Sequence, residues 1–251
     1  MESATDQMTE TDRRPPTMGL VVLQACETIE DEFRGYLRDR RVVLHHSRIP
    51  SAARLTHASL ETMAADLAAA VDLFPVGADF DVIGYACTSA AAVIGEGRVA
   101  KIIGEVRPGS ALSNPTTAAK AALDALGTRR LGLLTPYSAD IADELAANFR
   151  DAGYGIAAAV SFDEEIEARV ARIDPETILK AVVSLTGKAE MDAVFISCTN
   201  LRCAEIIAEA ERRTGLPVLS SNQVLLWHML ELAGVETSGL AADRLFSVGR
   251  G

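Results

Sequence analysis

Two cysteines stand in almost the same local sequence and could act as a nucleophile and an acid on one substrate. Cys87 lies in "GYACTSAAAVIGEG" and Cys198 lies in "VFISCTNLRCAEII". Each follows a short apolar run and precedes a threonine and a second small polar residue. A thiolate is a strong nucleophile and a thiol can supply a proton, so a facing pair favours isomerase or racemase chemistry.

The residues after both cysteines are suited to binding an anion. The apolar runs are typical of strands and the following segments of helices, so each cysteine is expected at a helix N-terminus. Backbone N–H groups there can bind a carboxylate, and the helix dipole is expected to lower the thiol pKa from its usual value of about 8.5. The residues concerned are Thr88, Ser89, Thr199 and Asn200.

Apolar runs and helical patterns alternate along the chain, which predicts an α/β fold with parallel strands and helices on both faces. The sequence also resembles itself after a shift of 111 residues, which carries Cys87 onto Cys198 and Cys26 onto Tyr137. We therefore expect two pseudo-symmetric halves, each a parallel sheet of about four strands flanked by helices. In such sheets ligands bind at the carboxyl ends of the strands, so the site is expected in the cleft between the halves.

The repeat also predicts how the chain is divided. Residues 1–17 are polar and are expected to form a disordered leader. The first half is expected to span residues 18–126, with residues 226–251 returning to it as a C-terminal helix. The second half is expected to span residues 127–225.

Composition excludes several functional classes. Of the 251 residues 49% are hydrophobic and 24% charged, as in soluble globular proteins, and the net charge of −11 argues against nucleic-acid binding. No apolar run approaches the roughly 20 residues that cross a membrane, so a cytoplasmic protein with reduced cysteines is expected. Neither a metal-binding spacing nor a dinucleotide fingerprint is present. We expect no metal or cofactor, a small carboxylic acid as the partner, and a homo-oligomer.

The cysteine motifs, the half-repeat and the segment "PVLSSNQVLLWHM" resemble the aspartate/glutamate racemase superfamily over about residues 18–235. The likeness is strongest to the branch of maleate cis-trans isomerases, arylmalonate decarboxylases and ectoine-utilisation proteins. Arylmalonate decarboxylases keep only the second cysteine. The presence of both Cys87 and Cys198 therefore favours an isomerase or racemase.

This resemblance implies roles for individual residues. Cys87 resembles the nucleophile that adds to the double bond and gives a succinyl-type adduct, whose C–C bond rotates before elimination. Cys198 resembles the acid/base group at the neighbouring carbon, and Tyr137 resembles a tyrosine that donates a hydrogen bond to a substrate carboxylate. The carboxylate-binding groups implied are Thr88, Ser89, Thr199 and Asn200.

Two positions depart from the maleate isomerase pattern. Cys26 takes the place of a substrate-binding asparagine, and could be either a site residue or a buried structural thiol. A second family asparagine falls within "SFDEEIE", near Glu164, where an acidic group would favour a cationic or amino group on the substrate. Four functions therefore stay open: a maleate isomerase, an amino-acid racemase of ectoine-type catabolism, an arylmalonate-type decarboxylase and a non-catalytic small-acid binding protein.

Overall fold

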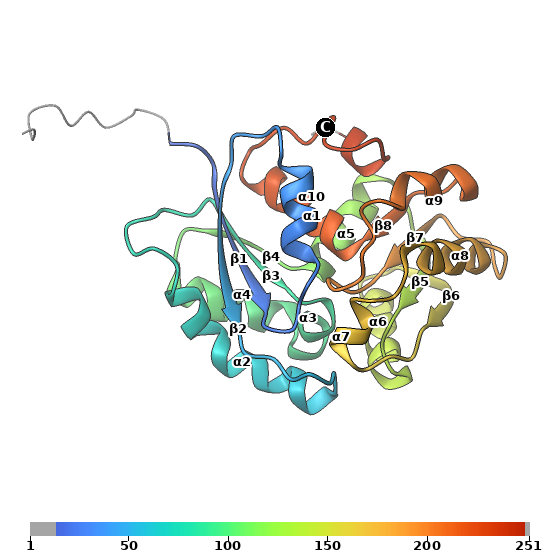
Figure 1. Ribbon diagram of the computed structural model, residues 1–251, viewed down its shortest axis with the longest axis horizontal. Helices are drawn as coiled ribbons and strands as arrows, with labels where there is room; N and C mark the ends of the chain where they lie inside the picture. The colour runs from blue at the N-terminus through green and yellow to red at the C-terminus, as the bar shows by residue number, and fades with distance from the viewer. Residues whose placement is uncertain (1–13, 249–251) are drawn as a thin grey trace, which may run out of the picture.

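The computed structural model describes residues 14–248, which form two sheets of four parallel strands each (Figure 1). The strand order is β2-β1-β3-β4 in the first sheet and β6-β5-β7-β8 in the second, so both halves share one topology. The predicted α/β fold with two parallel four-stranded halves is confirmed. The strands are β1 Thr17–Leu23, β2 Val43–Ile49, β3 Val82–Ala86, β4 Ala111–Ser113, β5 Arg130–Thr135, β6 Gly155–Ser161, β7 Ala193–Ile196 and β8 Val218–Ser220.

Helices pack against each sheet, and the two halves lie side by side (Figure 1). Helices α2, α4 and α10 contact strands of the first sheet, while α6, α8 and α9 contact strands of the second. The helices are α1 Ile29–Tyr36, α2 His57–Asp72, α3 Thr88–Ile94, α4 Glu96–Val106, α5 Pro115–Ala125, α6 Ala139–Asp151, α7 Glu167–Val170, α8 Pro175–Thr186, α9 Ile207–Thr214 and α10 Ser221–Leu232, with the 3-10 turn η2 at Leu245–Ser247.

The central strands are continuous apolar runs because both of their faces are covered. Every residue of β1, β3 and β7 is buried, whereas β2 and β6 at the sheet edges are only partly buried. The 111-residue shift carries β3 onto positions 193–197, and β7 begins at Ala193. Both cysteine motifs therefore lie at the carboxyl ends of equivalent central strands.

The chain crosses from the second half to the first at a single helix. Strand β8 ends at Ser220, and α10 begins at Ser221 with a capping box between Ser220 and Gln223. Helix α10 then packs against α5, β3 and β4 of the first half. The predicted boundary at residue 226 falls within this helix, and the domain limits stay a prediction. Residues 1–13 of the predicted leader lie outside the described residues, and Thr17, its last residue, is the first of β1.

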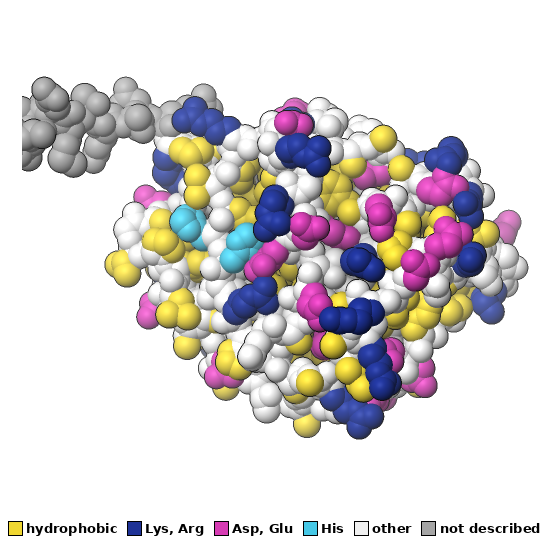
Figure 2. All heavy atoms as spheres, in the orientation of Figure 1, with side chains coloured by type: hydrophobic (Ala, Val, Ile, Leu, Met, Phe, Trp, Pro, Cys, Tyr) yellow, Lys and Arg dark blue, Asp and Glu magenta, His cyan; other side chains and the backbone are white. Residues whose placement is uncertain are grey.

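Charged side chains of both signs are interspersed on the face shown in Figure 2. Surface ion pairs join the halves; in two of them Arg172 lies 2.9 Å from Glu27, and Arg54 lies 2.8 Å from Glu165. Exposed pairs of this kind contribute only about 0–1 kcal/mol each, so the buried contacts described below set the relative position of the halves. Across residues 14–248, no helix is both long and apolar enough to cross a membrane.

The packing of α10 on β3 predicts the effect of one substitution. A side chain at Gly84 would meet Met229 Sδ at 2.6 Å and a Leu20 methyl at 3.2 Å. We expect Gly84→Val to lower the free energy of unfolding by about 1–3 kcal/mol in urea titrations, because overpacking strains a filled core. Adding Met229→Ala should restore part of that loss. Gly97→Ala, in open space on α4, is the control and should not destabilise; equal effects of the two glycine substitutions would contradict the packing.

Candidate active site

Cys87 is the N-cap residue of α3, directly after β3, and only 3% of it is exposed. Its Sγ accepts a hydrogen bond from the Ala90 N–H at 3.4 Å and lies 3.6 Å from the Ser89 hydroxyl. The sulfur thus takes the place of the oxygen that usually caps a helix. Two hydrogen-bonding groups point at the position where a thiolate would develop negative charge.

Cys198 follows β7 and is equally buried, but its surroundings differ. Its Sγ accepts a hydrogen bond from the Asn200 N–H at 3.4 Å, and its own N–H donates to the Ser221 hydroxyl at 3.0 Å. Its φ angle is 147°, which a residue with a Cβ rarely adopts. Backbone strain of this kind occurs mainly at functional sites, where the surrounding contacts hold it in place.

Side-chain hydroxyls join the two cysteine motifs. Ser221, the first residue of α10, bonds to the Thr88 hydroxyl at 2.8 Å and also accepts the Cys198 N–H. The Thr199 hydroxyl donates to the Ala86 carbonyl at 3.2 Å, directly before Cys87. The hydroxyls of Thr88 and Thr199, predicted to bind substrate, therefore also make structural contacts between the halves. Ser221 was not among the site residues predicted from the sequence, although Ser221 lies in the "LSSN" segment that carries the family resemblance.

The side chain of Asn200 is hydrogen-bonded at both ends. Its Oδ1 accepts from the Glu27 N–H at 2.8 Å, and its Nδ2 donates to the Ala25 carbonyl at 3.3 Å and to a Glu167 carboxylate oxygen at 2.6 Å. The Thr28 hydroxyl also donates to the Asn200 carbonyl at 2.9 Å. The Asn200 side chain therefore holds neighbouring segments in place. Its backbone N–H, which donates to the Cys198 sulfur, is the group of Asn200 that contacts a candidate catalytic residue.

Glu167 is a buried carboxylate that the sequence analysis missed. It begins the short helix α7 and is 4% exposed, and burial raises the pKa of its carboxyl above the usual range. Burial raises the pKa values of Cys26, Cys87, Cys198 and Tyr137, and the charge of Glu167 adds to each of these shifts. Four acidic residues occur in "DEEIE", and nothing in their order shows which side chain turns inward.

The three remaining residues predicted from the sequence, Cys26, Tyr137 and Glu164, differ in their hydrogen-bond partners. Cys26 is buried and its thiol donates to the Thr199 carbonyl at 3.6 Å. The buried Tyr137 hydroxyl accepts a hydrogen bond from the Ser197 hydroxyl at 3.3 Å. Glu164 accepts from the Ile166 N–H at 3.0 Å and lies 3.7 Å from Arg169, so its carboxylate is occupied by its own segment.

Burial dominates the ionisation of the thiols. It raises the pKa of Cys87 to about 12, although the bonds from Ala90 and Ser89 act in the opposite direction. Burial and the Glu167 charge raise the pKa of Cys198 well above its usual value, against the bond from Asn200. The sequence-based expectation of lowered thiol pKa values is wrong for the free chain, because desolvation outweighs the helix N-terminus.

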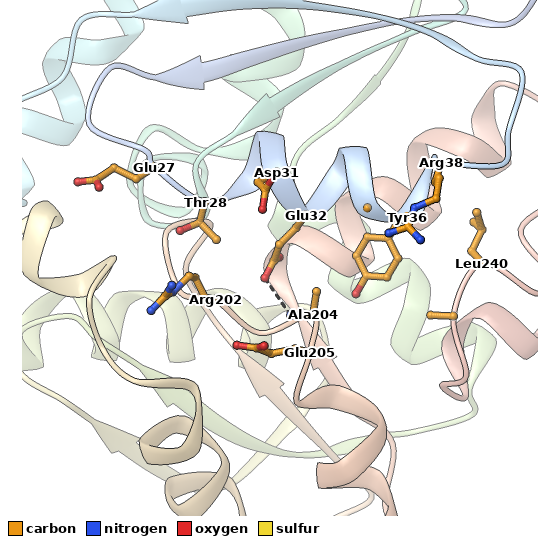
Figure 3. Close-up of a pocket in the computed structure, with 12 residues that line it drawn as sticks. Glu27, Thr28, Asp31, Glu32, Tyr36, Arg38, Arg202, Ala204, Glu205 and Leu240 are labelled. Atoms are coloured by element: carbon orange, nitrogen blue, oxygen red, sulfur yellow. Dashed lines mark hydrogen bonds between the residues drawn. The ribbon is translucent and has the colours of Figure 1, made fainter.

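The four cysteines are unpaired, and Cys203 packs in the core. The Cys203 N–H donates to a Glu32 carboxylate oxygen at 2.7 Å. The Ala204 N–H donates to the same oxygen at 2.9 Å (Figure 3). Glu32 also accepts from Asn222 at 2.7 Å, and so ties α1 to the loop after Cys198. An open cavity of about 510 Å³ borders this contact. No group of three or more metal-ligating side chains occurs within the described part of the chain.

Comparison with known proteins identifies the family. Residues 56–246 match the family model described as arylmalonate decarboxylase. The chain belongs to this family. An arylmalonate decarboxylase of Bordetella bronchiseptica is 32% identical over 120 residues, which cover 47% of this chain and 50% of that protein. A maleate isomerase of Alcaligenes faecalis is 28% identical over 249 residues, covering 92% of this chain and 96% of the relative.

Solved structures of family members share the fold. Maleate cis-trans isomerase of Nocardia farcinica, bound to TRIS, has a TM-score of 0.83 at 26% identity and covers 92% of this chain and 97% of its own. A cysteine-to-serine mutant of the same enzyme, with a covalently bound succinylcysteine intermediate, has a TM-score of 0.82 at 23% identity and covers 93% of this chain and 98% of its own. Both have the two-halved architecture described above.

The raised pKa values predict slow alkylation of the thiols. At pH 7.5 we expect iodoacetamide to modify Cys87 at least about 100-fold more slowly than a free cysteine, since the thiolate is the reacting form. The rate should then rise about tenfold per pH unit up to pH 9.5, followed for each cysteine by peptide mass spectrometry. The chain unfolded in urea is the control. A rate that stops rising near pH 8 would show that the thiol pKa is not raised.

The Ser221 contacts predict that removing the Ser221 hydroxyl lowers the stability of the protein and loosens the segment that holds Cys198. Ser221→Ala leaves the Cys198 N–H and the Thr88 hydroxyl without a partner, which should cost about 1–3 kcal/mol of unfolding free energy. It should also speed alkylation of Cys198 at pH 9. Ser47→Ala, which removes a buried 2.6 Å bond to Ala70 far along β2, should lower stability without changing that rate. Unchanged Cys198 reactivity in Ser221→Ala would mean that the hydroxyl does not position the thiol.

Proposed function

We propose that this chain is a cofactor-independent isomerase of a small carboxylic acid, similar to maleate cis-trans isomerase, in which Cys87 and Cys198 carry the reaction. The observation that carries the proposal is the pair of buried thiols at equivalent strand ends, in two motifs that Ser221 joins through the Thr88 hydroxyl and the Cys198 backbone N–H. Maleate isomerases that align over nearly the whole chain, and the succinylcysteine seen in one of them, support it.

In the proposed reaction, the Cys87 thiolate adds to one carbon of the double bond, and Cys198 gives its proton to the other. The C–S bond forms as the π bond breaks, which leaves a succinyl thioether and a Cys198 thiolate. The former double bond is now single and rotates. Cys198 then removes the proton from the same carbon, and the C–S bond breaks to release the trans isomer with both sulfurs in their starting states.

The same residues support a second reaction, racemisation of an amino acid. One thiolate would remove the α-proton from one face, and the other thiol would return a proton to the opposite face. Glu167 favours this alternative, because a buried carboxylate beside the thiols suits a substrate with an amino group. An ectoine-derived amino acid is the substrate that this reading suggests.

A cytoplasmic location and a homo-oligomeric state belong to the same proposal. The location is suggested by the absence of a membrane-length apolar run and by four cysteines expected to be reduced. Static light scattering on a gel-filtration column tests the oligomeric state, and a dimer or tetramer is expected.

Proton NMR in D₂O tests the reaction. Wild type is offered maleate, aspartate, glutamate and ectoine breakdown products, and we expect maleate to become fumarate. Cys87→Ser should lower that rate at least about 1,000-fold, because the adduct needs the sulfur. Cys203→Ala, which alters a buried thiol outside the site, should retain turnover.

Other outcomes select among the alternatives. Deuterium at an amino acid's α-carbon, without maleate turnover, would establish a racemase. Release of CO₂ from an arylmalonate would establish a decarboxylase. Binding of a carboxylate without exchange of any carbon-bound hydrogen would leave a small-acid binding protein and refute the proposed enzyme.

A further inference from the structure

Glu167 is a buried carboxylate with no positively charged partner in the part of the chain that the structure describes. Across residues 14–248, its carboxylate has one hydrogen-bond donor, Asn200 Nδ2 at 2.6 Å, and neither a lysine, an arginine nor a histidine lies within ion-pair distance. The two arginines that follow it in the chain turn outward, Arg169 towards Glu164 and Arg172 to Glu27. Buried charges are normally paired, so this carboxylate lacks the partner that its surroundings require.

The position of Glu167 is fixed by both halves. Its N–H donates to the Ala53 carbonyl at 3.1 Å, and its carbonyl accepts from Asn200 Nδ2 at 3.1 Å. Two residues earlier, the Glu165 carbonyl accepts the Leu55 N–H at 2.9 Å. The backbone of this segment is therefore held between residues 53–55 of the first half and Asn200 of the second. The carboxylate itself is held by Asn200 Nδ2, and turning it to solvent would break that hydrogen bond.

Burial raises the pKa values of four ionisable groups of the site, and the charge of Glu167 adds to each of these shifts. The four groups are Cys26, Cys87, Cys198 and Tyr137, which lie beyond the carboxyl ends of β1, β3, β7 and β5. Asn200 holds the carboxylate through its side chain and the Cys198 sulfur through its backbone N–H. A ligand between the thiols therefore lies close to a buried carboxyl group that has no positively charged partner among residues 14–248.

We infer that Glu167 contacts the substrate and determines its specificity, by binding an ammonium group at the end opposite the substrate's carboxylate. The inference rests on the proposed function, and it ranks the acids that the site accepts: one with a carboxylate and an amino group should bind more tightly than a dicarboxylate such as maleate, which the site should turn over at higher concentration. A second carboxylate would be repelled by Glu167, whereas an ammonium group would supply the missing positive partner.

Two unreactive ligands test this directly. Succinate carries two carboxylates on a two-carbon spacer, and β-alanine replaces one of them by an ammonium group on the same spacer. By isothermal titration calorimetry at pH 7.5, wild type should bind β-alanine about 10- to 100-fold more tightly than succinate, the range expected for a charged hydrogen bond. Glu167→Gln should remove that preference or reverse it.

The matched control removes the same charge from the same segment. Glu165→Gln loses the surface pair with Arg54 and should keep the wild-type preference. Thermal unfolding establishes that each variant is folded. The comparison within wild type needs no variant, so the inference stays testable if Glu167→Gln does not fold. Tighter binding of succinate, equal or undetectable binding of both ligands by wild type, or an unchanged ratio in folded Glu167→Gln, would each overturn it.

The two proposals fail separately. Neither ligand has a double bond or a stereocentre, so their binding does not depend on turnover. If the preference changes in Glu167→Gln while wild type turns over no acid, the enzyme proposal fails and the specificity of the site stands. If wild type isomerises an acid while the ligand ratio is unchanged in folded Glu167→Gln, the role of Glu167 fails and the enzyme proposal stands.

Discussion

The contacts of Asn200 are the constraint on which the arrangement of the halves depends. One buried amide bonds to Ala25, Glu27 and Glu167, while its backbone N–H bonds to the Cys198 sulfur. Buried polar groups must find partners, so these contacts allow one relative position of three segments that are far apart in sequence. The strand ends of both halves, and the thiols on them, meet as a consequence.

Burying these groups sets the chemistry as well as the geometry. The same exclusion of water that strengthens the hydrogen bonds of Asn200 also opposes ionisation of Cys87, Cys198 and Glu167. The free chain therefore holds its thiols protonated, and a thiolate has to form near Glu167, whose negative charge opposes it whenever that carboxyl is ionised. A ligand that neutralises Glu167 would remove one of the charges that oppose the thiolate, which links substrate binding to activation of the nucleophile.

Periodicity and internal repetition in the sequence were enough to predict the strands and the two-halved fold. Continuous apolar runs predicted the central strands, and the 111-residue shift predicted two equal topologies with a cysteine at each equivalent strand end. The sequence was uninformative about Glu167 and Ser221, because contacts from distant segments decide which acidic residue turns inward and which hydroxyl joins the motifs. The direction of the thiol pKa shifts was wrong for a related reason, since the helix N-terminus is visible in sequence and the depth of burial is not.

Differences between the two halves give the two thiols different surroundings. Cys87 caps α3 and receives two hydrogen bonds that favour its thiolate, and Glu167 is a minor influence on it. Cys198 receives one such bond, and after burial the Glu167 charge is the strongest influence on its pKa. A negative neighbour keeps Cys198 protonated longer than Cys87 as pH rises. Under the proposed function, these unequal surroundings suit Cys87 to act as the nucleophile and Cys198 as the acid.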